Sequence, residues 1–495
     1  MRGIRAAALL ILAAAVIAAA PASAQRLDVL QAVKEGDEGA TKPRPDTGVP
    51  APVLTRVTGG PLYSSIQKDA EGGTTALILQ LGETVRRMAG QPAHGTSWLL
   101  LSEEEGGFAK RGFWLRSDKG DPKGDRWIPD PYVDLVVDEK SIADGGFEEI
   151  FAHESGHVFL RTLFPALPDG YSRTPHASLT LTDEATAFDE GFATHFQGIA
   201  RILTRSPQLR RADLGLAWRP IASLWMSEID REMRITGMRN NLFIYSQPAL
   251  PGDEHQRTRQ DLSSLFDRTH LKTGEQLLAS EGFVATVFYH FLADGPDDPA
   301  ALAARYRPVF AALQRVQQAP PGRDGHFLPA VIQAMNETDP EAGRRMAALF
   351  VTLSYGATVE PDIARRIARA GQAGELGDME GFVAALKPLR KDLSDLAEKV
   401  SAAPALLTKA LAPPLWVMLP GEAPFDLNTG EAEQLNGLPG IGPDLARKLV
   451  ESRRSEGSFG SLGNFAGRAG LSQEDGAGLS RLHAALLAAG PYVRQ

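Results

Sequence analysis

Hydrophobic positions recur at helical spacing from about residue 146 to about residue 400. The pattern is clearest in FEEIFAHESGHVFLRTLF, DEATAFDEGFATHFQGIARIL and GEQLLASEGFVATVFYHFLA, where apolar residues return every three or four positions. Clusters of Pro and Gly, such as DGPDDP and APPGRDG, divide this region into separate segments. The pattern predicts a succession of amphipathic helices that makes up most of the protein.

A mixed pattern precedes the helical region, from about residue 56 to residue 140. The stretch from Thr75 to Met88 fits one helix. Three short apolar runs fit strands: SWLLL (97–101), GFWLR (112–116) and YVDLVVD (132–138). Together with the helical region, these segments predict an α+β fold that is predominantly helical and has a small sheet near the N-terminus.

The first 24 residues read as a secretory signal peptide and not as part of the fold. Two arginines precede the apolar run at 6–20, and the small residues at 22–24 fit a cleavage site near Ala24. We therefore expect export to the periplasm or secretion, with an uncleaved anchor as the alternative. No later stretch is long and apolar enough to cross a bilayer, so no integral membrane span is expected in the mature chain.

The composition is that of an ordinary soluble globular protein, with 43% hydrophobic and 23% charged residues. The formal net charge of -9 argues against a protein that coats nucleic acid or anionic membrane with its whole surface. The chain contains no cysteine, so disulfides are excluded. Any bound metal must be held by His, Asp or Glu side chains.

The stretch FAHESGHVFL (151–160) contains two histidines in the arrangement His-Glu-x-x-His. On a helix, His153 and His157 lie one turn apart on the same face, where both imidazoles reach one metal ion. Glu154 lies beside them, positioned to act on a water molecule and not on the metal. The spacing predicts a Zn²⁺ site; the alternative is a helix that carries these polar residues without a metal.

A catalytic zinc site needs a third protein ligand and an open position. The later stretch EGFA (190–193) lies on a second predicted helix, and with HESGH it resembles the gluzincin metallopeptidases, in which such a helix supplies a glutamate within Glu-Gly-x-Ala. The resemblance implies a zincin-like fold with Glu190 as the third ligand, although Glu190 follows His157 by more residues than is usual. Glu184 and Glu281 stay open as alternative third ligands.

The same resemblance implies a zinc-dependent metallopeptidase whose substrate is a peptide or protein. Glu154 would act as the general base on zinc-bound water. A further donor usually stabilises the oxyanion, and the candidates are His195, His176, Tyr171, Tyr289 and His290. The strand predicted at 132–138 is expected to bind substrate backbone by strand addition, as the upstream edge strand does in such peptidases.

The stretch from Asp426 to Leu462 resembles the helix-hairpin-helix domains of the ComEA type, which are found in DNA-uptake proteins. Its hairpin is LPGIG (438–442), where Gly440 and Gly442 allow a tight turn around Ile441. The backbone N–H groups at the start of the next helix can bind a DNA phosphate without reading sequence.

The charge of the C-terminal region leaves its partner open. Arg447 and Lys448, and also Arg453 and Arg454, would supply positive charge to a DNA contact. However, residues 421–495 contain nine acidic and seven basic residues, and Asp444 follows the hairpin. We therefore expect either non-specific DNA or a protein as the partner of residues 425–495.

Shifts in composition predict the domain organisation. We expect a signal peptide at 1–24, a flexible Pro/Gly-rich lead-in at 25–55, a zincin-like catalytic domain at 56–240, a helical domain at 241–401, a linker at 402–424 and an all-α helix-hairpin-helix domain at 425–495. The alternative to a peptidase is a non-catalytic exported protein for DNA binding or envelope assembly, with a peptidase-like scaffold.

Overall fold

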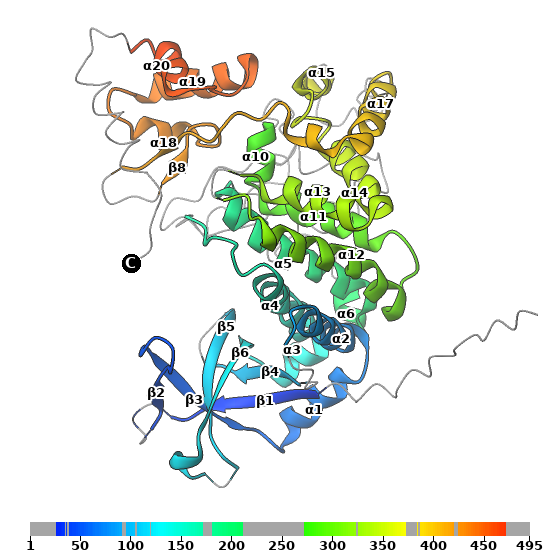
Figure 1. Ribbon diagram of the computed structural model, residues 1–495, viewed down its shortest axis with the longest axis vertical. Helices are drawn as coiled ribbons and strands as arrows, with labels where there is room; N and C mark the ends of the chain where they lie inside the picture. Colours follow the sequence, from blue (N-terminus) through cyan, green and yellow to red (C-terminus); the bar gives the residue numbers. More distant parts are fainter. Residues whose placement is uncertain are drawn as a thin grey trace, which may run out of the picture.

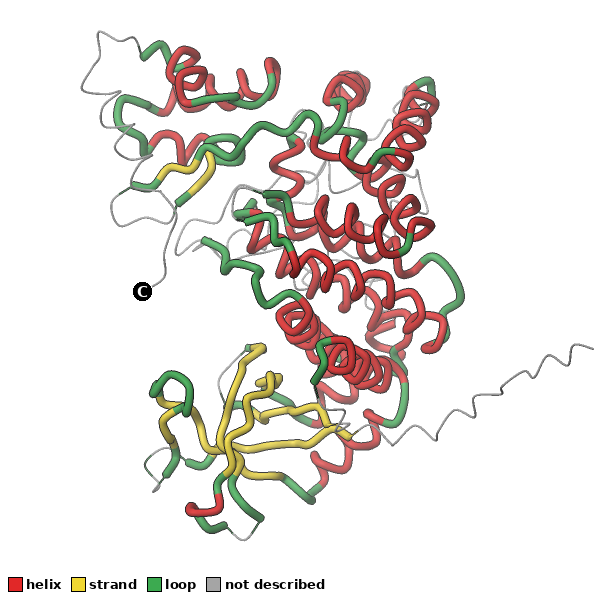
Figure 2. The backbone as a smooth tube through the Cα atoms, in the orientation of Figure 1, coloured by secondary structure: helices red, strands yellow, loops and turns green. Residues whose placement is uncertain are grey.

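The computed structural model places most of the chain (Figure 1). The described residues are 26–34, 36, 39–91, 96–103, 106–118, 120–171, 181–210, 272–322, 325–372, 384, 387–419 and 424–471. The expected signal peptide and the candidate His176 lie outside them. The structure is mixed α and β and predominantly helical, with the longer strands gathered at one end of the molecule (Figure 2).

Six strands form one sheet in the order β1-β4-β6-β5-β3-β2. Their bounds are β1 (Arg26–Ala32), β2 (Thr41–Pro43), β3 (Pro50–Arg56), β4 (Thr96–Leu101), β5 (Gly107–Leu115) and β6 (Arg126–Leu135). Because β1 also pairs with β3, five of these strands close into a ring, and β2 lies outside it on β3. The strands predicted at 97–101, 112–116 and 132–138 overlap β4, β5 and β6, and their existence is confirmed.

Large apolar side chains from all five strands of the ring pack together in one cluster. Its members are Leu30, Leu54, Trp98, Leu100, Phe113, Leu115, Ile128 and Tyr132. The ring of Phe113 lies edge-on to both Trp98 and Tyr132, with centroids 5.4 and 5.3 Å apart. Neighbouring residues such as Val29 and Leu99 point to the other face and join the core beneath the helices, as the alternation of a strand requires.

The prediction of a flexible lead-in at 25–55 is wrong. Residues 26–56 contain β1, β2 and β3, and β1 lies between β3 and β4 in the ring. The Pro residues at 50 and 52 hid β3, because proline inside an apolar run argues against a strand. Here they lie at the end of β3 that pairs with the short β2. The sheet therefore begins at residue 26 and not at 56.

The expectation that residues 132–138 form a substrate-binding edge strand is also wrong. Residues 133–135 of β6 pair with β4 on one side and with β5 on the other. Their backbone groups are therefore used inside the sheet, and none is left for a substrate strand.

Helices cover the sheet and continue away from it (Figure 1). They are α1 (Pro61–Ala70), α2 (Gly73–Met88), α3 (Glu139–Asp144), α4 (Gly146–Leu163), α5 (Glu184–Leu203), α6 (Pro207–Arg210), α10 (Gly274–Leu278), α11 (Glu281–Ala293), α12 (Pro299–Gln318), α13 (Phe327–Thr338), α14 (Pro340–Leu353), α15 (Pro361–Gln372) and α17 (Leu389–Ala402), with a short 3-10 helix, η1 (Pro122–Gly124), before β6. Helix α4 touches β5 and β6 on one side and α5 on the other. Among the described helices, none has the length and hydrophobicity that a membrane span requires.

One apolar core joins the sheet to the helices and contains residues from Leu27 to Leu407. Helix α5 packs on α11, so the helices before and after the domain boundary predicted near residue 240 share this core. The boundary itself lies outside the described residues.

The C-terminal module, residues 415–471, has a second, separate core. Its elements are β7 (Trp416–Val417), β8 (Phe425–Asp426), α18 (Ala432–Asn436), α19 (Pro443–Glu456) and α20 (Leu462–Arg468). The pairing of β7 with β8 corrects the expectation of an all-α domain. The prediction of a linker at 402–424 needs correction as well, because these residues contain the 3-10 helix η5 (Pro404–Thr408) and β7.

The C-terminal module is docked on the helices through buried polar contacts and not tethered freely. Gln276 of α10 donates to the Thr429 carbonyl at 3.4 Å and also to the carboxylate of Glu431. The neighbouring Glu275 accepts the backbone N–H of Ala412, just before the module, at 3.0 Å. Because such contacts require matched donors and acceptors at fixed positions, they hold the module in one orientation on α10.

A buried lysine beside this interface makes the stability depend on pH. Lys272 donates to Ser280 at 2.5 Å, and burial lowers its pKa to about 7, although Glu431 raises it. In the unfolded chain the lysine titrates near 10.5, so between these pH values the unfolded state binds the proton and the folded state does not. The contribution of Lys272 to stability therefore rises with pH over that window.

Replacing Lys272 with Met, which has a similar shape and no charge, is expected to stabilise the protein near pH 7 and to lose this advantage toward pH 10. The measurement is the denaturant midpoint of both proteins across the window. The exposed Lys409→Met is the control and should show no such trend. Parallel curves for wild type and Lys272→Met would contradict the assignment.

Candidate metal centre

Helix α4 carries His153 and His157 on the face that meets α5. The helix is buried because Phe147, Phe151 and Phe159 enter the core on its other faces. Gly156, between the histidines, lets the two helices approach closely: a Cβ atom there would lie 2.8 Å from the Cα of Ala193. The helix predicted from HESGH is thus present, and its small residue faces α5.

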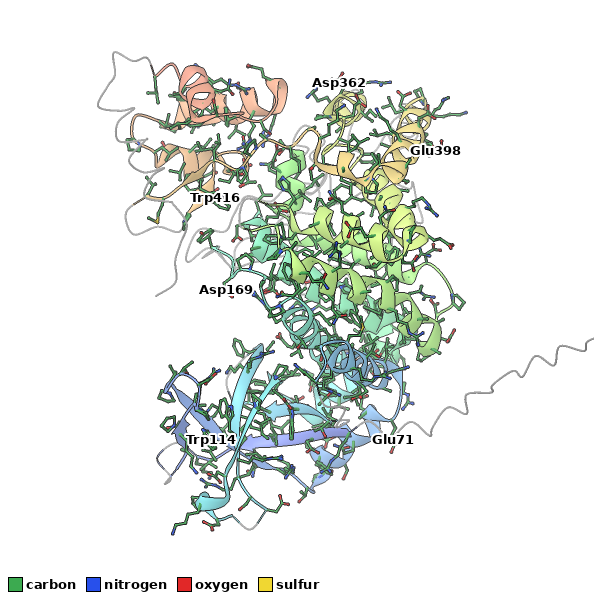
Figure 3. The ribbon with its side chains drawn as sticks, in the orientation of Figure 1. Glu71, Trp114, Asp169, Asp362, Glu398 and Trp416 are labelled. Carbon is green, nitrogen blue, oxygen red and sulfur yellow. The ribbon has the colours of Figure 1, made fainter. Side chains whose placement is uncertain are left out.

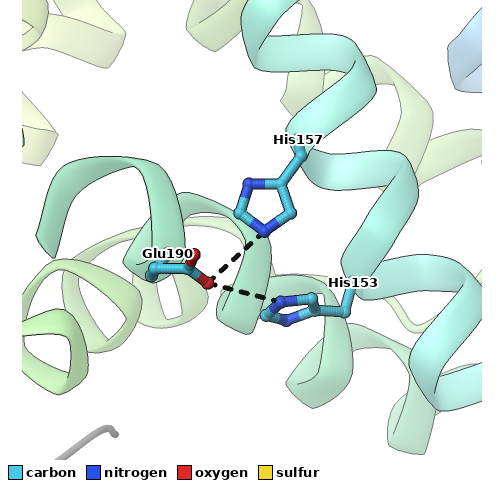
Figure 4. Close-up of side chains that lie close together, drawn as sticks. All are labelled: His153, His157 and Glu190. Atoms are coloured by element: carbon cyan, nitrogen blue, oxygen red, sulfur yellow. Dashed lines mark ion pairs between the residues drawn. The ribbon is translucent and has the colours of Figure 1, made fainter. Parts of the chain in front are cut away.

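Helix α5 brings Glu190 opposite the two histidines (Figure 4). Asp183 caps the N-terminus of the helix, and its side chain accepts the backbone N–H groups of Ala185 and Thr186. Gly191 allows close packing on α11, because a Cβ atom there would lie 2.6 Å from the Glu281 carbonyl oxygen. This packing fixes the rotation of α5 and hence the direction of Glu190.

The three side chains converge on one point. The Oε2 atom of Glu190 lies 3.6 Å from Nε2 of His153 and 3.4 Å from Nε2 of His157. Ligands at ordinary distances from a tetrahedral zinc ion are roughly 3.4 Å apart, so these spacings fit. Among the described residues, this is the one group of three or more His, Cys, Asp or Glu side chains whose ligand atoms all lie within 4.8 Å of one another.

The Nδ1 atom of His153 is buried and makes no hydrogen bond to the described residues. A buried ring nitrogen without a partner costs free energy. Coordination of a metal through Nε2 would leave Nδ1 as the N–H donor of the ring, so this atom does not itself test the metal. The donor set of two imidazoles and one carboxylate is one that zinc prefers. The residues therefore fit a zinc ion.

The electrostatics around His157 favour a positive charge. Burial by itself lowers the pKa of a histidine, but Asp189 and Glu190 raise the pKa of His157 well above its usual value. Burial has the opposite effect on a carboxyl group and acts to raise the pKa of Asp189. The neighbouring His157 and Arg161 outweigh this effect, so the pKa of Asp189 is lowered. A position that holds a cation between two carboxylates is also suited to a metal ion.

Glu154 points toward the start of β5. Its side chain is 7% exposed, and a Cβ atom on Gly107 would lie 2.8 Å from its Oε1. Glu154 does not belong to the group of converging ligand atoms.

Asp189 and Arg161 support the site and were not predicted from the sequence. The Oδ1 atom of Asp189 lies 2.8 Å from Nδ1 of His157, and its Oδ2 accepts Nε of Arg161 at 3.0 Å. A carboxylate on the second ring nitrogen of a metal-binding histidine fixes the tautomer and orientation of the ring. The available signal was the position of Asp189 next to Glu190, with Arg161 one helical turn after His157.

Asp189→Asn is expected to weaken zinc binding by about 10- to 100-fold, because the histidine loses its charged partner. Competition with a chelator measures the affinity. Asp362→Asn is the matched control, since the exposed Asp362 also pairs with an arginine, Arg365, but lies on α15 (Figure 3) and not on a helix of the candidate centre. An unchanged affinity in Asp189→Asn would show that Asp189 does not orient His157.

The two alternative third ligands have other partners. Glu184 accepts Nδ1 of His326 at 3.0 Å and the backbone N–H of Phe327 at 2.9 Å. Glu281 accepts the hydroxyl of Thr194 at 2.8 Å. Neither belongs to the converging group, so the geometry favours Glu190.

The candidate oxyanion donors do not gather at the centre. His195 is fully buried, 3.0 Å from the hydroxyl of Tyr306, and burial lowers its pKa to about 3. Tyr289 and His290 line a different cavity with Arg345. These positions argue against an oxyanion role, because a buried core histidine and residues of another cavity do not face the ligands.

Tyr171 is also turned toward a neighbour other than the metal ligands. Its backbone N–H donates to Asp183 at 2.7 Å, and its ring packs edge-on against Trp416 with centroids 5.3 Å apart. The structure thus places Tyr171 between the N-terminus of α5 and the C-terminal module.

The hairpin of the C-terminal module is open to solvent. Gly440 has a φ of 83°, and a Cβ atom on Gly442 would meet nothing within 4 Å. Ile441 is buried in the module core, so it holds the hairpin and leaves its backbone outside. Arg447 and Lys448 are exposed on α19, and Arg447 pairs with Asp444.

Arg453 does not reach the surface, which corrects the expectation that it supplies positive charge to a DNA contact. It is 1% exposed and donates to the carbonyl oxygens of Leu427 and Gly430, each at 2.7 Å. It also pairs with Glu431 at 3.3 Å, and Arg454 lies 3.6 Å from the same carboxylate. The two arginines hold the module together and are not free to bind DNA.

Comparison with known proteins identifies one part of the chain. No curated protein and no solved structure matches it. A family model described as the helix-hairpin-helix motif matches residues 422–475, the region that contains the open hairpin and α19. Residues 422–475 are therefore a helix-hairpin-helix region of the kind expected from LPGIG.

Proposed function

We propose that this protein is a zinc-dependent metallopeptidase with a C-terminal helix-hairpin-helix docking module. The observation that carries the proposal is the convergence of His153, His157 and Glu190, whose ligand atoms lie within 4.8 Å of one another. Glu154, on the helix of the two histidines, supplies the general base that hydrolysis needs. Their arrangement supports the gluzincin-like reading of the sequence, with two ligands from α4 and the third from α5.

Each side chain has a definite role in this proposal. His153, His157 and Glu190 hold the ion, and Asp189 orients His157. When bound, a zinc ion polarises the scissile carbonyl and lowers the pKa of water. Glu154 takes a proton from the attacking water on its carboxylate and returns it to the leaving amine. The low exposure of Glu154 keeps bulk water from competing for that proton.

The helix-hairpin-helix region supports a second, separate activity. Its hairpin is open to solvent, and Lys448 is exposed on the helix that follows. These features fit a module that binds the backbone of duplex DNA or a protein. Binding to DNA should weaken steeply with salt, whereas a protein contact need not.

The test of the peptidase proposal begins with the metal content of purified residues 25–495. Elemental analysis should find about one zinc per chain in wild type and none in the variant His153→Ala/His157→Ala. Hydrolysis of a peptide library should disappear with a chelator and return with added zinc. Failure to bind zinc after reconstitution would reject the peptidase and favour a non-catalytic exported protein for DNA binding or envelope assembly.

A further inference from the structure

The segment 164–171 connects the zinc-ligand helix α4 to the region before α5, and it is held at several points. Arg161 donates to the Leu167 carbonyl at 2.7 Å and lies 3.5 Å from the carboxylate of Asp169. Farther along, a Cβ atom on Gly170 would overlap the hydroxyl of Thr186 at 1.7 Å. The segment is therefore pressed against the first turn of α5.

Arg161 links this segment to the metal ligands. The same guanidinium that binds the Leu167 carbonyl also pairs with Asp189, which contacts His157 at 2.8 Å. A displacement of the segment would pull on the guanidinium that holds Asp189. The orientation of the His157 ring then depends on where the segment lies.

The C-terminal module contacts the end of the segment. The Trp416 ring from β7 packs edge-on against Tyr171, at an interplanar angle of 65°. The backbone N–H of Tyr171 donates to Asp183, which also caps α5. In Figure 3, Trp416 and Asp169 lie on the same side of the molecule. Since the module is fixed on α10 through Glu431 and Thr429, Trp416 is presented from a rigid support.

We propose that the C-terminal module braces the metal centre, with Trp416 as a positioning residue that holds Tyr171 and the segment 164–171 in place. The positions of the Asp189 and His157 side chains then depend on the docking of the module. This inference rests on the proposed zinc function for its effect on metal affinity, but the bracing itself is a property of the protein without metal. A partner bound to the module could change the metal centre through this contact path.

The test compares Trp416→Ala with Trp416→Phe, which keeps an aromatic ring for Tyr171. In the full chain without added metal, the hydrogen-exchange rates of residues 165–171 and 184–190 should rise several-fold in Trp416→Ala. In Trp416→Phe these rates should lie close to those of wild type. Exchange in α19 should stay as in wild type, which shows that the module remains folded. Tyr171→Leu should reproduce the effect, and combining it with Trp416→Ala should add little.

The second readout is the zinc dissociation constant, expected to rise on the order of fivefold in Trp416→Ala. Unchanged exchange at 165–171 and 184–190 would overturn the brace, whatever the protein does with zinc. Increased exchange with an unchanged zinc affinity would overturn the positioning role of Trp416. If wild type binds no zinc, the peptidase proposal fails, and the exchange data alone decide whether the brace exists.

Discussion

Glu154→Gln is expected to lower the rate of peptide hydrolysis by about 100- to 10,000-fold while leaving zinc bound. The loss follows because glutamine cannot accept the proton of the attacking water, and general-base catalysis contributes on that order. Zinc should remain, because the converging ligand atoms belong to His153, His157 and Glu190. The measurement is kcat on a peptide substrate beside the zinc content of the same sample.

Glu149→Gln is the matched control for this experiment. Glu149 lies on the same helix as Glu154, but it accepts Nη2 of Arg201 at 3.2 Å and does not belong to the candidate centre. The peptidase activity of the Glu149→Gln variant should stay near that of wild type. A wild-type rate in Glu154→Gln would remove Glu154 from the mechanism. Loss of zinc in that variant would mean that Glu154 is a ligand and that the assignment of Glu190 must be reconsidered.

Arg453→Ala is expected to destabilise the C-terminal module by about 3–5 kcal/mol, the cost of removing one partner from a buried ion pair. The substitution leaves the carbonyl oxygens of Leu427 and Gly430 without this donor. It also leaves Glu431 with one arginine fewer in a place where its carboxylate is buried. Because Glu431 contacts Gln276, the docking on α10 should weaken as well.

The control for this variant is Arg447→Ala, on the same helix. Arg447 is 63% exposed and pairs with the exposed Asp444, so its loss should change stability by less than about 1 kcal/mol. Hydrogen exchange of the α19 amides measures the local free energy of opening in both variants. Equal exchange in the two would show that the buried ion pair does not hold the module together.

The sequence alone was sufficient where the physical cause is local. Two histidines four residues apart share one helix face whatever surrounds the helix, so the sequence could place His153 and His157 side by side with Glu154 next to them. The turn at Gly440 was equally predictable, because its positive φ is a conformation that glycine adopts at little cost. The apolar runs of β4, β5 and β6 identified those strands for a similar reason: their side chains are buried in a regular order.

Tertiary structure decided which distant groups meet. The resemblance favoured Glu190 and left Glu184 and Glu281 open, and the packing at Gly156 and Gly191 brings only Glu190 of the three to the two histidines. Asp189 and Arg161 become partners of His157 through the same packing.

Tertiary contacts also determined strands β1 and β3 and the burial of Arg453. The pairing partners of β1 and β3 lie far along the chain, and two prolines obscure the pattern of β3. Arg453 looks like any basic residue on a helix until the fold places Glu431 and two carbonyl oxygens around it. Local spacing thus determined the chemistry that this chain can offer, and the crossing of helices and the closure of the sheet decided which of those groups form the site.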